Sequence, residues 1–168
     1  MGNIIEIKIF YKIILTISIL SILIALYIEF FLGYKPCKLC IYQRIPYVLA
    51  IFITFIGISY SKNLVWLYTL LIIFFSSFLL SGYHFGIEKE IFNEFSGCTV
   101  NSINVTDKDE LLELLNSKVS TSCKKVDFTI FGMSLASINL LLSLIIFILI
   151  FIVIKNEKNK QKKIRRIH

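Results

Sequence analysis

Two of the four cysteines stand close together, in the string Cys37-Lys38-Leu39-Cys40. A C-x-x-C pair can close a small disulfide ring, and its thiols often ionise more readily than an ordinary cysteine. Pro36 precedes the pair and can begin a helix, whose positive end would face both sulfurs and favour the thiolate. Thiolate is the form that attacks disulfides. The spacing therefore predicts a redox-active dithiol.

The remaining cysteines, Cys98 and Cys123, are far apart in the chain. An even number of cysteines, all outside the apolar blocks, indicates disulfides in an oxidising compartment. A tetrahedral zinc site is one alternative, but structural zinc sites usually come from two closely spaced pairs. Two purely structural disulfides are another. Catalysis is favoured over both because an arginine follows the C-x-x-C pair.

This arginine, Arg44, lies four residues after Cys40, and residues at that spacing share one face of a helix. At a membrane boundary its guanidinium can hydrogen-bond a quinone carbonyl and stabilise developing negative charge. The alternative is an arginine that only contacts lipid phosphate. Pro46 complicates the geometry, because a helix that begins near Ile45 would leave residues 40–44 as a turn.

His84 is a second polar residue expected at a membrane boundary. With Tyr83 and Glu88 it could form a proton route or a second quinone contact, since quinone reduction consumes two protons. The alternative, an interfacial anchor made of His84 and Tyr83, is equally consistent with the sequence.

The elements that must position these residues are four apolar blocks. Apolar residues make up 57% of the chain and charged residues 17%, whereas soluble domains are nearer half and a quarter. A bilayer core needs about 20 apolar residues per helix. We therefore expect one all-α membrane domain, a four-transmembrane-helix bundle over residues 1–168. The expected spans are approximately 9–32, 42–61, 63–85 and 128–154.

The first span does not resemble a cleaved signal peptide, because it is too long and no small-residue cleavage site follows it. The positive charge is concentrated after the last span. Seven of the 18 basic residues lie in the tail 155–168, which is typical of a cytoplasmic anchor near anionic membrane lipids. A nucleic-acid partner is disfavoured, because no aromatic residues or folded module accompany this run.

Four spans and the basic tail predict that both termini are cytoplasmic. The outer loops are then residues 33–41 and 86–127, and they contain all four cysteines. Three outer basic residues oppose this topology, but the tail outweighs them: Lys35, Lys38 and Arg44. Within the second loop, the leucine spacing and acidic first turn of residues 106–119 predict a short amphipathic surface helix.

The string 35–44 (KPCKLCIYQR) closely resembles the first loop of the disulfide bond formation protein DsbB family. Residues 82–88 (GYHFGIE) and 132–136 (GMSLA), together with Cys123, support the resemblance, which covers nearly the whole chain. It implies a bacterial inner-membrane quinone reductase that reoxidises the periplasmic dithiol oxidase DsbA or a relative. The implied quinone would be ubiquinone or menaquinone. Gln43 stands where some members have Glu.

The resemblance also implies separate roles for the four cysteines. Cys98 would form the mixed disulfide with the partner, and Cys123 would be its loop mate. Cys123 would then exchange with Cys37, which leaves Cys40 as the thiolate facing a quinone held by Arg44. Three other classes stay open: a vitamin K epoxide reductase-like enzyme, a disulfide-clamped membrane scaffold, and a metal-binding membrane protein.

Overall fold

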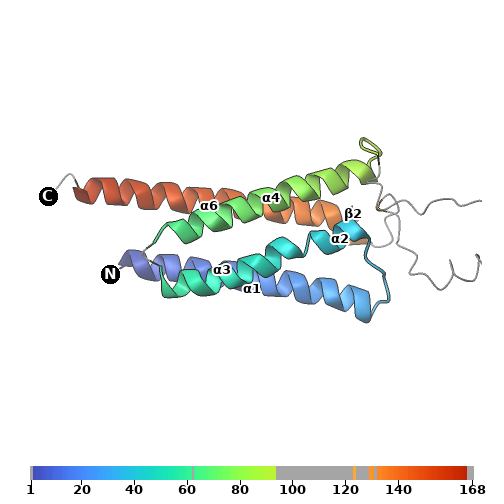
Figure 1. Ribbon diagram of the computed structural model, residues 1–168, viewed down its shortest axis with the longest axis horizontal. Coiled ribbons are helices and arrows are strands. Elements are labelled where there is room, and N and C mark those ends of the chain that lie inside the picture. Colours follow the sequence, from blue (N-terminus) through green and yellow to red (C-terminus); the bar gives the residue numbers. More distant parts are fainter. Residues whose placement is uncertain (1, 62, 94–122, 124–128, 131, 166–168) are drawn as a thin grey trace, which may run out of the picture.

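The computed structural model describes residues 2–61, 63–93, 123, 129–130 and 132–165, and within them the protein is a bundle of four long helices (Figure 1). The helices are α1 (Gly2–Phe30), α2 (Lys38–Tyr42), α3 (Ile45–Ser59), α4 (Val65–Glu88) and α6 (Leu135–Arg165). Four helical stretches are long and apolar enough to cross a membrane, so the expected all-α membrane bundle is confirmed. Cys98, the expected surface helix 106–119 and most of the second loop lie outside the described residues.

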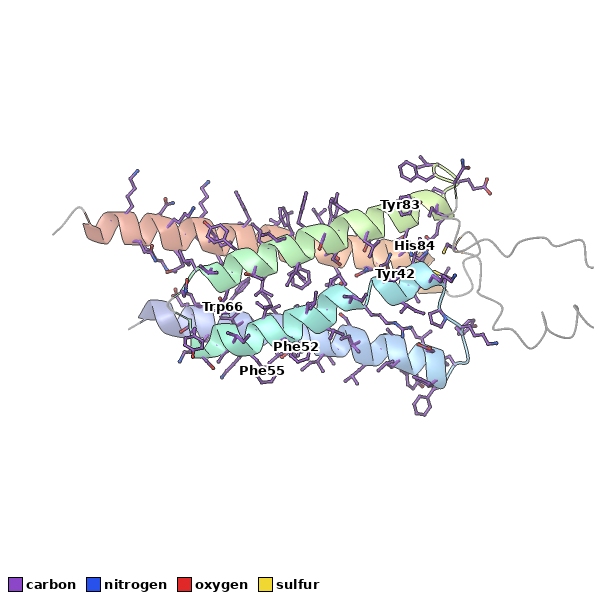
Figure 2. The ribbon with its side chains drawn as sticks, in the orientation of Figure 1. Tyr42, Phe52, Phe55, Trp66, Tyr83 and His84 are labelled. Carbon is purple, nitrogen blue, oxygen red and sulfur yellow. The ribbon has the colours of Figure 1, made fainter. Side chains whose placement is uncertain are left out.

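The outer surface of the bundle is strongly apolar. Large aromatic side chains such as Phe30, Phe52 and Phe55 are more than half exposed. Figure 2 shows Phe52 and Phe55 pointing outward from α3. Such a surface suits lipid rather than water.

The interior combines large apolar side chains with small residues at the helix contacts. Tyr11, Phe74 and Ile150 are fully buried in the central core. Ser77 of α4 and Ser143 of α6 lie 3.0 Å apart, oxygen to oxygen, in a buried hydrogen bond. Small residues and interhelical hydrogen bonds hold helices together where lipid removes the usual hydrophobic driving force.

A turn separates the short helix α2 from α3. The backbone N–H of Arg44 donates to the carbonyl of Ile41, and Arg44 then serves as the N-cap of α3. Pro46 occupies the first turn of α3, where its missing N–H costs nothing. Two turn residues, Gln43 and Arg44, therefore interrupt the regular helix between Cys40 and the start of α3. The sequence had left open whether Cys40 and Arg44 share one helical face, and the continuous helix that would guarantee it is absent here.

The fourth long helix begins later than the expected residue 128 and extends beyond 154. Residues Thr129–Ile130 (β1) and Met133–Ser134 (β2) pair as an antiparallel hairpin instead, with Gly132 at φ 77° in its turn. The hydroxyl of Ser134 then accepts the N–H of Ser137 at 3.1 Å and caps α6. The helix continues through the basic tail to Arg165.

The other long helices also depart from the expected bounds. α1 begins at Gly2 and ends at Phe30, and α4 continues to Glu88. The start of α1 and the end of α6 lie at one end of the bundle, and α2 lies at the other (Figure 1). At the first end, Lys160 of α6 lies 3.1 Å from Glu6 of α1 and 3.1 Å from Glu157. An ion pair thus links α1 and α6 at the end of the bundle that lies away from α2.

Candidate functional site

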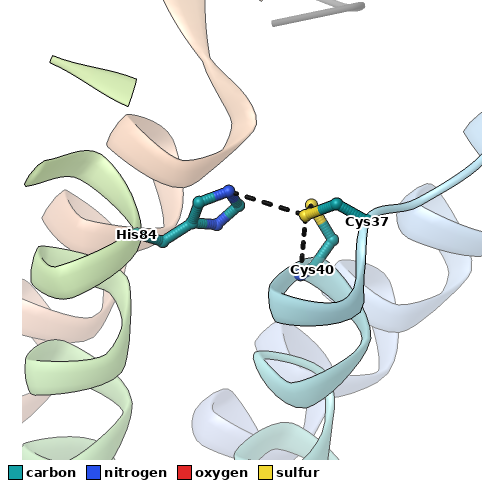
Figure 3. A group of neighbouring side chains, drawn as sticks. All are labelled: Cys37, Cys40 and His84. Carbon is teal, nitrogen blue, oxygen red and sulfur yellow. Dashed lines mark hydrogen bonds between the residues drawn. The ribbon is translucent and has the colours of Figure 1, made fainter. Parts of the chain in front are cut away.

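Cys37 and Cys40 lie in direct contact at the start of α2 (Figure 3). Cys37 is the N-cap of α2, so Pro36 lies before the helix rather than in its first turn. The backbone N–H of Cys40 donates to the sulfur of Cys37 at 3.3 Å. The thiol of Cys37 in turn donates to the sulfur of Cys40 at 3.0 Å. The two sulfurs are therefore placed for dithiol–disulfide exchange.

The two thiols are not equivalent. The hydrogen bond to Cys40, and then burial, raise the pKa of Cys37 to about 12, although the nearby His84 opposes the change. The expectation that both cysteines favour the thiolate is thus wrong for Cys37. A sulfur that donates its hydrogen to a neighbour holds that proton, whereas the acceptor sulfur gains stabilisation for negative charge.

His84 lies on α4 and is almost fully buried against this pair. Its Nε2 is 3.6 Å from the sulfur of Cys37 and 3.9 Å from a carboxylate oxygen of Glu88. Its Nδ1 is 2.9 Å from the side-chain nitrogen of Gln43. The structure therefore places His84 next to the sulfurs, inside the bundle, and not at an exposed interface.

Arg44 pairs with an acidic residue that the sequence reasoning did not single out. Its Nη1 lies 2.5 Å from Oε2 of Glu29, near the end of α1, and both side chains are about a quarter exposed. The sequence signal was a carboxylate at the end of an apolar block, where an uncompensated charge is expensive. This ion pair therefore holds the side chain of Arg44 against α1.

A cavity of about 320 Å³ joins these residues. Cys37, Cys40, Arg44 and His84 all line it, so the turn before α3 brings Cys40 and Arg44 to one space despite the break in the helix. Much of the remaining wall is apolar and comes from α1 and α6: Ile22, Ala25, Ile28, Ala136, Ile138 and Leu142. Apolar walls with a few convergent polar groups are typical of small-molecule sites.

The size and lining of this cavity fit a quinone head group. Ligand cavities begin at about 300 Å³, and a flat ring of this kind needs apolar walls along its faces. Arg44 uses one nitrogen for Glu29, and a guanidinium has further N–H groups to offer a carbonyl oxygen. Cys40 lines the same cavity.

A second polar group that sequence reasoning missed lies on α6. Asn139 donates from Nδ2 to Oε1 of Gln43 at 3.1 Å and to the hydroxyl of Ser81 at 2.7 Å. The hydroxyl of Tyr47 donates to Oδ1 of Asn139. A single polar residue in an apolar block has no spacing pattern, so only the fold connects it to His84.

Cys123 is buried in a small cluster with Cys37, Leu39 and Ile87. It also lines the cavity. The structure therefore brings together three of the four cysteines, one of which comes from the second loop. Cys98 lies outside the described residues.

The sulfurs of Cys37 and Cys40 and a nitrogen of His84 lie within 4.8 Å of one another, a set that zinc could use. An amide nitrogen only donates, however, so Gln43 requires the lone pair of Nδ1. In the neutral ring, Nε2 then carries the hydrogen and offers no lone pair to a metal. The arrangement suits thiol chemistry better than metal binding.

Two comparisons with known proteins bear on this site. The family model described as "Disulfide bond formation protein DsbB" matches residues 8–153, which include all four cysteines. The chain is also 29% identical over 158 residues to "Uncharacterized protein RP370" of Rickettsia prowazekii (strain Madrid E). That match covers 92% of this chain and 91% of the relative.

Proposed function

Because the chain belongs to the DsbB family of disulfide bond formation proteins, we propose that it is a quinone-linked membrane thiol oxidase. Its thiol partner is a periplasmic, DsbA-like dithiol oxidase with a thioredoxin fold. The membrane is the bacterial inner membrane, both termini are cytoplasmic, and the cysteine loops are periplasmic. The observation that carries the proposal is a contacting Cys37–Cys40 pair that lines one cavity with Arg44.

The overall reaction is a transfer of two electrons and two protons. The two thiols of the partner become a disulfide, and a quinone, when bound, takes up both electrons and both protons to become a quinol. In the family order of exchange, a thiolate of the partner attacks Cys98 of a Cys98–Cys123 disulfide, forms a mixed disulfide with Cys98 and releases Cys123. Cys123 then attacks Cys37 of a Cys37–Cys40 disulfide and releases Cys40 as the thiolate. The second thiol of the partner displaces Cys98, Cys98 displaces Cys37 from Cys123, and Cys37 and Cys40 close their disulfide again as their two electrons reduce the quinone. Each exchange replaces one disulfide with another, so no external oxidant enters before the quinone.

Three features of the site support this order. Cys123 and Cys37 share one buried cluster, as an exchanging pair requires. Cys40 accepts the hydrogen bond of Cys37, which stabilises negative charge on the sulfur that must end as the thiolate. Arg44 lines the cavity with that sulfur and can stabilise negative charge on a quinone oxygen.

The direct test is turnover with purified protein, a reduced DsbA-like partner, and ubiquinone or menaquinone in separate assays. We expect oxidation of one partner molecule for each quinone reduced, and loss of quinone reduction in Cys40→Ser. Absence of turnover with both quinones, or full turnover by Cys40→Ser, would contradict the proposal. A disulfide-clamped scaffold predicts something different, namely weaker folding in Cys40→Ser with partner oxidation unchanged.

A further inference from the structure

A chain of hydrogen bonds runs through four elements of the bundle and reaches the cysteine pair. It begins at Tyr47 of α3, whose hydroxyl donates to Oδ1 of Asn139 on α6. Asn139 donates from Nδ2 to Oε1 of Gln43 at 3.1 Å. The nitrogen of Gln43 lies 2.9 Å from Nδ1 of His84 on α4.

Two independent observations assign the hydrogen between His84 and Cys37 to the histidine. First, Asn139 donates to the oxygen of Gln43, so the amide nitrogen faces Nδ1 of His84 and must donate to it. The neutral ring then carries its hydrogen on Nε2, the atom 3.6 Å from the sulfur of Cys37. Second, the single hydrogen of the Cys37 thiol is already donated to Cys40. Cys37 can therefore only accept from His84.

Every donor in this chain thus points in one direction. The order is Tyr47, Asn139, Gln43, His84, Cys37 and finally the sulfur of Cys40. Hydrogen bonds in such a chain polarise one another, by about 10–30% per bond. Low dielectric strengthens the effect, and His84, Gln43 and Tyr47 are each less than a tenth exposed. The last acceptor receives the accumulated effect.

From this we infer that Tyr47, Asn139 and Gln43 are positioning residues that fix the tautomer of His84 and so stabilise the thiolate of Cys40. The inference rests on the proposed function for its purpose, because that function requires Cys40 as the thiolate facing the quinone. Tyr47, Asn139 and Gln43 hydrogen-bond to one another and to His84 in the described part of the chain, and so act on the charge of Cys40 through His84 and Cys37.

Other charged groups near Cys40 set the background against which this control acts. Cys37 and Cys123, together with Glu88 and His84 of α4, face the same sulfur, and three further charged residues line the cavity: Glu29, Lys35 and Arg44. A negative charge on Cys123 or Glu88 opposes the thiolate. Substitution of Tyr47 or Asn139 leaves all of these residues in place, so it isolates the contribution of the hydrogen-bond chain.

The first test is the tautomer itself, measured by NMR on protein labelled with ¹⁵N-histidine. The chain has two histidines, His84 and His168, so the spectrum contains one site signal and one internal reference. We expect the neutral ring of His84 to carry hydrogen on Nε2 and none on Nδ1. Asn139→Leu should bring in the other tautomer, since Gln43 is then free to rotate. Hydrogen on Nδ1 in the wild type would overturn the inference.

The second test is the pH dependence of alkylation at Cys40, read by mass spectrometry on the reduced, quinone-free protein. In Asn139→Leu the midpoint should move upward by about half a pH unit, and in Tyr47→Phe by a few tenths. Tyr11→Phe is the matched control, because it removes another buried hydroxyl that has no hydrogen-bond partner among the described residues. It should leave the midpoint unchanged.

An unshifted midpoint in Asn139→Leu would overturn the inference. If that variant does not fold, Tyr47→Phe decides in the same way, and an unshifted midpoint there has the same meaning. Both tests are independent of quinone turnover. If neither the tautomer nor the midpoint behaves as expected in a protein that still reduces quinone, only the role of the hydrogen-bond chain is rejected. Absence of quinone reduction in the wild type would reject the proposed function and leave these measurements valid.

Discussion

Arg44 and Glu29 form an ion pair of 2.5 Å between the turn before α3 and the end of α1. Glu29 occupies one nitrogen of the guanidinium, and both side chains line the cavity that contains Cys40. The carboxylate thus holds the arginine in one orientation and compensates its charge before any ligand binds. This relationship makes Glu29 part of the candidate quinone site.

We expect Glu29→Ala to raise the KM for quinone roughly fivefold, because loss of about 1 kcal/mol of orientation weakens binding by that factor. Exchange between the partner and the cysteines should be unchanged. Glu29→Gln is the matched variant, because it keeps an oxygen that accepts from Arg44, and its KM should stay within about twofold of the wild type. The measurement is steady-state quinone reduction with the partner held in excess. Equal KM values for wild type and Glu29→Ala would show that the pair is only structural.

Arg44→Ala should have a larger effect in the same assay. Removal of the guanidinium takes away the proposed donor to the quinone and leaves Glu29 without its partner, so we expect the KM to rise at least tenfold, about 1.4 kcal/mol. Arg44→Lys keeps the charge but loses the planar set of donors, so its KM for quinone should lie between those of the wild type and Arg44→Ala. A single-turnover assay without quinone should give wild-type partner oxidation in both variants. Unchanged quinone kinetics would identify Arg44 as a lipid-contacting residue.

The bundle could be predicted from sequence because it depends on long apolar blocks, and each block supplies one helix. The helix interruption at Gln43 and Arg44 was harder to predict, because the spacing of Cys40 and Arg44 suits a continuous helix. Only Pro46 indicates that a new helix begins after Arg44. The hairpin before α6 is apolar enough to read as part of a span, and only Gly132 and the capping Ser134 mark its end. Local sequence patterns therefore predict that a helix exists more reliably than they predict where it begins and ends.

Only part of the candidate site could likewise be predicted from the sequence. Cys37, Cys40, Arg44 and His84 could be selected because their types and spacing suggest chemistry, and all four line one cavity. Glu29 and Asn139 could not be assigned partners, because those partners, Arg44 and Gln43, lie 15 and 96 positions away in the chain, in the turn between α2 and α3. Pairings between helices depend on rotation and register, which apolar periodicity leaves undetermined.

Gly57 of α3 allows α1 to approach closely, and its substitution should destabilise the bundle. A Cβ at this position would lie 2.6 Å from the ring of Tyr11, which is fully buried and cannot move aside. We expect Gly57→Ala to cost about 1–3 kcal/mol, the usual range for overpacking. Gly82→Ala is the control, because its Cβ would meet only Leu140 at an ordinary 3.7 Å. Thermal unfolding in mild detergent should show a lower midpoint for Gly57→Ala alone, and similar midpoints would argue against this packing.

The raised pKa of Cys37 predicts an unequal response of the two thiols to pH. Cys37 donates its hydrogen to Cys40 and is buried, and these causes raise its pKa to about 12. In the reduced protein, alkylation of Cys37 should therefore be much slower than that of Cys40 at pH 7–8. Above pH 8, the rate at Cys37 should rise about tenfold per pH unit. Since the main cause is the hydrogen bond to Cys40, Cys40→Ala should speed alkylation of Cys37 at pH 8. An unchanged rate would assign the shift to burial alone.

The same shift makes the stability of the reduced protein depend on pH in a defined direction. The folded state holds the proton of Cys37 more tightly than an unfolded chain, in which the thiol titrates near 9. Its contribution to the free energy of unfolding is therefore complete below about pH 9 and is lost as the pH rises toward 12. Denaturation in mild detergent should show the reduced wild type losing stability between these values. Cys37→Ala should show a smaller loss over the same interval, because the titrating group is gone, and an equal loss in both proteins would place the effect at another residue.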